Sequence, residues 1–310
     1  MRILVAYDGS ISADAAIDDL RRAGLPAQAE ALVVCVADKG LVPPHPADRK
    51  EIHADPDESS RSKLAEAEVL AGNASARLRS HFPQWTVSSE ALWGSPAKII
   101  LDTSARWHPQ LVAVGSHGRS VVARLFLGSV SMELIHKAAC SVRVTRMSAV
   151  PKSDDPIRIV IGSDGSEQAE MVIRSVTARS WPEGTEAQIV SAVQTLVPVT
   201  NELDASTFAQ EPAYSVIREA DERLRFRLES IAAESANALR RAGLIVTTRD
   251  VDADPREAIL TAAELVRADT IFIGARGLGR MERLLLGSVS NYIVTHAHCT
   301  VEVVRGNHAK

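Results

Sequence analysis

A glycine-punctuated segment occurs twice in the chain with the same internal spacing. The first copy runs Gly115-Ser116-His117-Gly118, then nine residues, then Gly128-Ser129. The second copy runs Gly274-Ala275-Arg276-Gly277, then nine residues, then Gly287-Ser288. Across 115–131 and 274–290, nine of seventeen positions are identical, and both copies end in Gly-Ser-Val-Ser. A repeat of this kind predicts two domains, each with a nucleotide-type pocket of its own.

The length of the chain fits this division. At 310 residues it is long for a single domain and natural for two domains of about 150 residues each. We expect the first domain at residues 1–147 and the second at residues 156–306, joined by the polar, proline-containing linker 148–155. Each half is large enough to bury a core of its own, so neither needs disulfides or a metal in order to fold.

Both halves repeat one order of apolar strands and amphipathic helices. The expected strands are 3–7, 31–37, 86–92, 111–114 and 141–145 in the first half, and 157–161, 187–193, 244–251, 270–273 and 300–304 in the second. Strands that are apolar on both faces and alternate with helices are typical of a parallel sheet covered on both sides. The sequence therefore predicts an α/β protein of two tandem, open, doubly wound parallel-sheet domains with five strands each.

The repeated glycines are suited to holding a phosphate with main-chain N–H groups. Glycine permits unusual backbone angles and lets the main chain approach a ligand closely. We expect Gly128-Ser129 and Gly287-Ser288 to open a helix, where unpaired N–H groups and the helix dipole attract an anion. Asp8 and Asp164, at the ends of the first strands, are the candidates for contact with a ribose or a base.

Each of these features also has a purely structural interpretation. A Gly-x-x-Gly segment is common in strand-to-helix turns, Ser129 is a suitable N-cap, and Asp8-Gly9-Ser10 is a turn that can cap the first helix. The recurrence of all three features in both halves favours the binding interpretation.

The composition and the remaining motifs argue against several classes of function. A net charge of −4 argues against nucleic-acid binding, and the strongest apolar run, 31–37, is too short to cross a membrane, so we expect a cytoplasmic protein. No Gly-Lys pair of a P-loop occurs, and Ser129 and Ser288 have no identifiable base, so no residue is assigned a catalytic role. No metal ligands are assigned either, because His296-Ala297-His298-Cys299 has no second ligand cluster.

The chain resembles the universal stress proteins, in the tandem form with two such domains in one polypeptide. The two Gly-x-x-Gly-nine-Gly-Ser motifs carry the resemblance, with support from Val5-Ala6-Tyr7-Asp8-Gly9-Ser10, Val160-Ile161-Gly162-Ser163-Asp164-Gly165-Ser166 and Gly94-Ser95-Pro96. The similarity covers nearly all of both halves. It implies an adenine nucleotide alpha hydrolase-like fold, and its glycine motif is that of the family members that bind ATP.

This resemblance implies two ATP sites, with or without Mg²⁺. By motif matching, the first site consists of Asp8, Val36, Gly115, Gly118, Gly128, Ser129 and Val130, and the second of Asp164, Ala192, Gly274, Gly277, Gly287, Ser288 and Val289. In each site, the glycines, the serine and the valine would surround the ribose and phosphates. The aspartate, and the main chain of Val36 or Ala192, would meet the adenosine end.

The function implied is that of a stress-response regulator or sensor that acts through its nucleotide-bound state. A slow ATPase and a nucleotide-free protein-interaction scaffold remain as alternatives. We expect ATP and an unidentified protein as partners and self-association into a homodimer, but no nucleic-acid or membrane partner. The loop residues Ser116-His117 differ from Ala275-Arg276, so the two pockets can differ in affinity.

Overall fold

The computed structural model describes residues 1–38, 58–118, 127–146, 156–192, 212–277 and 286–306. The chain divides into two compact units. The first comprises Met1–Val150 and Gly306–Lys310, and the second comprises Pro151–Arg305. The expected linker, 148–155, lies outside the described residues. Each unit is therefore considered from its own strands and helices.

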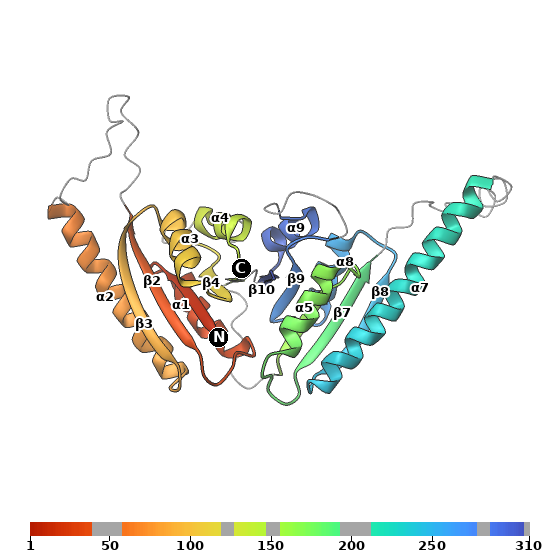
Figure 1. Cartoon of the computed structure of the whole chain (residues 1–310), viewed down its shortest axis with the longest axis horizontal. Helices are drawn as coiled ribbons and strands as arrows, with labels where there is room; N and C mark the ends of the chain where they lie inside the picture. Colours follow the sequence, from red (N-terminus) through yellow and green to blue (C-terminus); the bar gives the residue numbers. More distant parts are fainter. Residues whose placement is uncertain (39–57, 119–126, 147–155, 193–211, 278–285, 307–310) are drawn as a thin grey trace, which may run out of the picture. The chain divides into compact units, whose positions relative to one another are not determined.

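Among its described residues, the first unit forms a sheet of five parallel strands. In chain order its elements are β1 (Arg2–Tyr7), α1 (Ile11–Asp19), the short 3₁₀ helix Leu20–Arg22, β2 (Glu30–Asp38), α2 (Glu58–His81), β3 (Thr86–Gly94), α3 (Pro96–Trp107), β4 (Leu111–Gly115), α4 (Ser129–Lys137) and β5 (Ser141–Thr145). The strands lie in the order β3-β2-β1-β4-β5 (Figure 1). The winding direction therefore changes between β1 and β4.

The described part of the second unit repeats this architecture. Its elements are β6 (Arg158–Gly162), α5 (Glu167–Thr177), β7 (Glu186–Ala192), α7 (Pro212–Arg241), β8 (Ile245–Val251), α8 (Pro255–Leu265), β9 (Thr270–Gly274), α9 (Ser288–His296) and β10 (Thr300–Val304). The strands are parallel and lie in the order β10-β9-β6-β7-β8 (Figure 1). The winding direction of this unit changes between β6 and β9.

The central strands are apolar on both faces because helices cover each face. In β1, Ile3 and Val5 join the core that α1 and α2 form with the sheet. Leu4 points to the opposite face, since successive strand residues alternate, and it is also fully buried. In β6, Ile159 lies in the equivalent core and Val160 is buried on the other face. The predicted doubly wound parallel sheets are thus confirmed.

The outer strands β3 and β8 do not follow the expectation that every strand is apolar on both faces. In β3 only Val87 and Gly94 are buried, and in β8 only Val246 is buried; the other residues of both strands are exposed or half-buried. On each, an arginine of the preceding long helix bonds a carbonyl: Arg79 Nη2 donates to Val87 O (2.7 Å), and Arg240 Nη2 donates to Val246 O (3.0 Å). These carbonyls face outward, because the residue before each one bonds the neighbouring inner strand.

The long helices α2 and α7, of 24 and 30 residues, each cover one face of a sheet. Ala74 and Leu78 of α2 lie in the first core, and Ala236 and Leu239 of α7 lie in the second. Their described outer faces are mostly polar, apart from the exposed side chains of Val69 and Phe226. Within the described ranges, no helix combines the length and the apolar character needed to span a bilayer.

Candidate functional site

The carboxyl ends of β1 and β4 border a cavity in the first unit. The parallel register pairs Ala6 with Val114. Asp8, which follows β1, and Gly115, which ends β4, therefore lie at the same edge of the sheet. The cavity has a volume of about 280 Å³. It lies where the winding direction changes, which is the usual ligand position in open α/β sheets.

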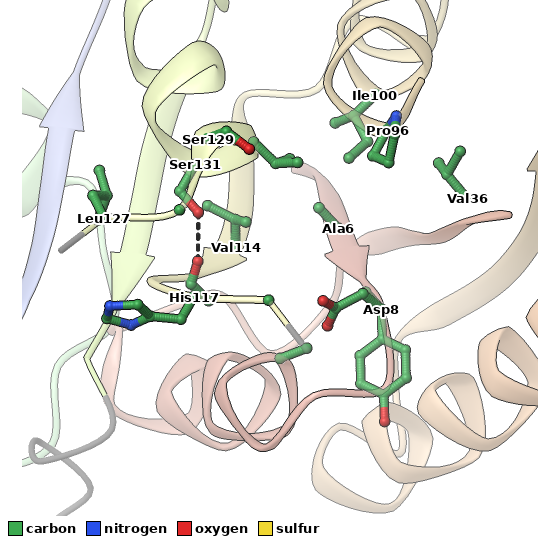
Figure 2. Close-up of a pocket in the computed structure, with 16 residues that line it drawn as sticks. Ala6, Asp8, Val36, Pro96, Ile100, Val114, His117, Leu127, Ser129 and Ser131 are labelled. Carbon is green, nitrogen blue, oxygen red and sulfur yellow. Dashed lines mark hydrogen bonds between the residues drawn. The ribbon is translucent and has the colours of Figure 1, made fainter. Parts of the chain in front are cut away.

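The structure brings together all the residues predicted for the first site. Those that line the cavity are Asp8, Val36, Gly115, Gly118, Gly128, Ser129 and Val130. Figure 2 shows Val36, Pro96 and Ile100 to the right of Ser129, with Asp8 below them. The cavity therefore has a polar end at α4 and an apolar end at β2 and α3.

The second unit has a corresponding cavity at the carboxyl ends of β6 and β9. Its volume is about 530 Å³. Every residue predicted for the second site lines it, namely Asp164, Ala192, Gly274, Gly277, Gly287, Ser288 and Val289. In both units, the fold thus assembles residues that lie more than a hundred positions apart in the sequence.

Helices α4 and α9 begin at the cavities. In α4, the first helical hydrogen bond runs from Met132 N–H to Gly128 O (2.9 Å), so the N–H groups of Ser129, Val130 and Ser131 precede the intrahelical bonds. These three residues line the first cavity. The start of α9 repeats this arrangement in the second unit. Such N–H groups, at the positive end of a helix dipole, are suited to binding an anion.

One of the N–H groups expected to meet a phosphate is already hydrogen-bonded within the protein. Gly128 N–H donates to Ser116 O (2.7 Å), and Gly287 N–H donates to Ala275 O (2.8 Å). The row of available donors thus begins one residue later, at Ser129. The N-cap interpretation of Ser129 is wrong as well, because Gly128 occupies that position and makes no side-chain capping bond.

Sequence reasoning missed the second serine of each Gly-Ser-Val-Ser segment. Ser131 Oγ donates to Gly115 O (2.7 Å; the dashed line in Figure 2), and Ser290 Oγ donates to Gly274 O (2.7 Å). Both serines are buried. Each bond joins the start of a helix to the end of a strand and so holds the helix N-terminus at the cavity. The identity of the two copies at this position was the signal available in the sequence.

The two glycines of the Gly-x-x-Gly segment have different roles. A Cβ on Gly115 would lie 2.6 Å from the main-chain carbonyl of Ser12 in α1, so glycine is needed there for close packing of the helix. A Cβ on Gly118 would instead lie 3.0 Å from Asp8 Oδ2, and one on Gly277 would collide with the corresponding carboxylate. The first glycine is therefore explained by geometry, whereas the second keeps the surface beside the carboxylate open.

Asp8 is held in a fixed orientation by the turn that follows β1. Its Oδ1 accepts a hydrogen bond from Ser10 N–H (3.0 Å), and Ser10 Oγ caps α1 by accepting from Ala13 N–H (3.1 Å). The same contacts recur at Asp164. The capping interpretation of Asp-Gly-Ser is thus confirmed. Because Oδ1 serves the turn, Oδ2 is the oxygen that lies beside Gly118 at the cavity.

The histidine-rich segment before β10 makes protein contacts. The ring of His296 stacks on Tyr292, with 3.9 Å between ring centroids, and its Nδ1 lies 2.9 Å from Tyr292 O. His298 pairs with Glu264, and Cys299 is buried. In the part of the chain that the structure describes, no group of three or more histidine, cysteine or acidic residues could hold a metal ion.

Comparison with known proteins places this architecture in a family. The model of the universal stress protein family matches residues 1–146 and 157–305. A universal stress protein of Mycobacterium tuberculosis is 29% identical over 308 residues, which cover 98% of this chain and 96% of the relative. A universal stress protein of Thermus aquaticus is 33% identical over 150 residues, which cover 47% of this chain and 97% of the relative.

Solved structures share the fold over nearly the whole chain. The crystal structure of a universal stress protein from Archaeoglobus fulgidus has a TM-score of 0.62 at 19% identity and covers 98% of both chains. A functionally unknown protein from Pseudomonas aeruginosa has a TM-score of 0.61 at 13% identity, covering 99% of this chain and 92% of its own. With the family model matched in two successive segments, the chain belongs to the universal stress protein family and carries two of its domains in tandem.

Proposed function

We propose that each unit binds one ATP molecule and that the protein regulates the stress response through its nucleotide-bound state. Membership of the family supports a role in stress response. The observation that carries the proposal of ATP binding is the pairing, in each cavity, of a row of main-chain N–H groups at a helix start with an oriented aspartate.

The chemistry of each cavity fits the three parts of ATP. The N–H groups of Ser129, Val130 and Ser131 suit phosphate oxygens, and the carboxylate of Asp8 suits the hydroxyl groups of a ribose. The apolar side chains of Val36 and its neighbours suit a base. Cavities of about 300–1,000 Å³ are typical of small-molecule sites. The second cavity lies within that range, and the first lies near its lower end.

The strength of binding requires all three parts together. A charge at a helix N-terminus contributes about 0.3–1 kcal/mol where it is exposed and up to about 2 kcal/mol where it is partly buried. A micromolar complex needs about 8 kcal/mol in total. The phosphate contacts alone therefore do not suffice, and burial of the base and contact of the ribose with Asp8 must provide the remainder.

The lining of the cavities favours binding over rapid turnover. Of the described residues that line the first cavity, Asp8 is the only carboxylate, and Asp164 is its counterpart in the second. Each already accepts a main-chain hydrogen bond with Oδ1. Rapid phosphoryl transfer requires groups that hold Mg²⁺ and orient the attacking water. We therefore propose that the bound nucleotide acts mainly as a signal, which a homodimer or another protein partner detects.

The direct test is to denature the purified protein, identify the nucleotide released, and titrate nucleotide-free protein with ATP by calorimetry. We expect two equivalents of ATP for the parent protein and one equivalent for Gly118→Val or Gly277→Val. Gly72→Val, at an exposed position of α2 with no atom within 4 Å, is the matched control and should retain both. Two equivalents in Gly118→Val would contradict the site. ADP with steady phosphate release would indicate an ATPase, and no binding heat would indicate a scaffold.

A further inference from the structure

The two cavities differ in size although their predicted binding residues correspond one to one. The second cavity, at about 530 Å³, has nearly twice the volume of the first, at about 280 Å³. Leu224 and Leu228 of α7 line the second cavity. No described residue of α2, the corresponding helix, lines the first. The additional space therefore lies beside α7.

In the first unit, close packing of the long helix fills the corresponding space. Ala67 and Ala71 of α2 pack against Cys35 and Ala37 near the carboxyl end of β2, and Trp93 of β3 packs against the same cluster. The small alanine side chains let the helix approach the strand. With this packing, no described residue of α2 reaches the first cavity.

In the second unit, the corresponding helix position carries a larger residue. Leu78 of α2 and Leu239 of α7 occupy equivalent core positions, since the next residue of each helix, Arg79 or Arg240, bonds the outer strand. Eleven residues before that leucine stands Ala67 in α2 and Leu228 in α7. Leu228 packs on the turn after β6, since a Cβ on Gly165 would lie 2.9 Å from its Cδ2. It therefore holds α7 against this turn and lines the cavity at the same time.

Two further exchanges remove bulk from the second site. The strand pairings place Ala192 where the first unit has Val36, and Val251 where it has Leu92. The next residue in sequence is therefore Asp252 in the second unit and Trp93 in the first. Ala192 is two carbon atoms smaller than Val36. Asp252 forms an ion pair with Arg225 (2.7 Å), and 51% of its side chain is exposed. It therefore does not fill the volume that the indole fills in the first unit.

The order of the strands shows which end of a nucleotide would meet this space. Helix α9 follows β9, Asp164 follows β6, and Ala192 ends β7, and these strands lie in the order β9-β6-β7. A nucleotide with its phosphates at α9 and its ribose at Asp164 would thus extend its base towards Ala192. Leu224 and Leu228 line the same cavity from α7, which packs against β7 and β8, so they would adjoin the base.

We propose that the second site accepts an adenine nucleotide enlarged by an apolar substituent on the base, of the N6-alkylated class, whereas the first site accepts only the unsubstituted base. This inference rests on the proposed binding of ATP by both units. One well-placed methylene in an apolar pocket changes discrimination about 10- to 200-fold. An N6 substituent of several carbons should therefore bind at least about tenfold more tightly than ATP at the second site and be excluded from the first.

Calorimetric titration with ATP and with N6-benzyl-ATP tests the inference. We expect two equivalents of ATP and one equivalent of N6-benzyl-ATP. The N6-benzyl-ATP equivalent should persist in Gly118→Val and disappear in Gly277→Val. Two equivalents of N6-benzyl-ATP, or none, would overturn the inference while leaving ATP binding intact. If neither nucleotide binds, the proposed function itself is wrong, and this inference fails with it.

Filling the space provides a second, independent test. Leu224→Trp should lower the affinity for N6-benzyl-ATP relative to that for ATP by at least about tenfold. Phe226→Trp is the matched control, because Phe226 lies on the same helix and is 74% exposed, so the affinity ratio should not change. Circular dichroism verifies that both variants fold. An unchanged ratio in folded Leu224→Trp would show that the ligand does not reach α7.

Discussion

Alanine at Gly115 should destabilise the first unit without requiring any ligand. The new Cβ would lie 2.6 Å from the main-chain carbonyl of Ser12, whereas ordinary contacts begin at 3.4 Å. Either α1 or β4 must shift, and overpacking of this kind costs about 1–3 kcal/mol. The loss of unfolded-state entropy on replacing glycine offsets about 0.4–1 kcal/mol. We therefore expect a net loss of about 1 kcal/mol in the free energy of unfolding of this unit.

Alanine at Gly118 should instead lower the affinity for ATP and leave the free energy of unfolding nearly unchanged. Its Cβ would lie 3.0 Å from Asp8 Oδ2, at the end of a side chain that borders the cavity and can move by a few tenths of an ångström. The free energy of unfolding should change by about 0.5 kcal/mol or less. The methyl group would occupy the surface beside the carboxylate, so ATP affinity should fall about tenfold, which corresponds to about 1.4 kcal/mol. In Gly277→Ala the contact is closer, and the loss should be larger.

Urea unfolding and calorimetry measure these two effects separately. A Trp181→Phe background leaves Trp85, Trp93 and Trp107, all in the first unit, as fluorescence reporters. Gly72→Ala, at an exposed position of α2, controls for the general effect of replacing glycine by alanine. It should stabilise the unit by about 0.5–1 kcal/mol. The division of roles is refuted if alanine at the first motif glycine leaves the unfolding midpoint unchanged, or if alanine at the second leaves ATP affinity unchanged.

Three further substitutions test other parts of the structure. Ser131→Ala leaves Gly115 O without its buried donor and should cost the first unit about 1–2 kcal/mol in urea unfolding. Leu78→Ala empties a fully buried core position and should cost about 2–5 kcal/mol in the same assay. Asp254 caps α8, and its hydrogen bonds from Arg256 lower the pKa of the carboxyl to about 2. Since this pKa is depressed below 3.8, the stabilisation is complete above about pH 5 and falls as the pH drops through 2. Asp254→Ala should therefore cost about 1 kcal/mol at pH 7, and the difference should shrink in urea titrations as the pH is lowered from about 5 to 2.

The strands could be predicted closely because they are continuous apolar runs bounded by polar residues. The expected strand 31–37 corresponds to β2 at Glu30–Asp38, and 270–273 corresponds to β9 at Thr270–Gly274. In a strand that is buried on both faces nearly every residue is apolar, so the strand can be recognised without deciding which face meets the core. The handedness of the crossovers then determined where the strand ends would meet.

The hydrogen bonds and apolar contacts within the site could not be predicted, because they depend on how segments distant in sequence pack against one another. That Gly128 N–H bonds Ser116 O follows from the path of a loop, which no local pattern specifies. Leu224 and Leu228 share the apolar face of α7 with Leu239, which lies in the core. The period of a helix shows which face is apolar, but it does not show whether that face meets a sheet or an open volume.

The arginine contacts on the outer strands affect how readily this protein can pair with strands of other chains. An edge strand with unpaired N–H and C=O groups can pair with strands of other chains and so start aggregation. Here Val87 O and Val246 O already accept a hydrogen bond from an arginine guanidinium. A strand from another chain would therefore find fewer free carbonyl groups near the start of β3 or β8. Edge strands protected in this way are less able to pair with unfolded segments of other chains.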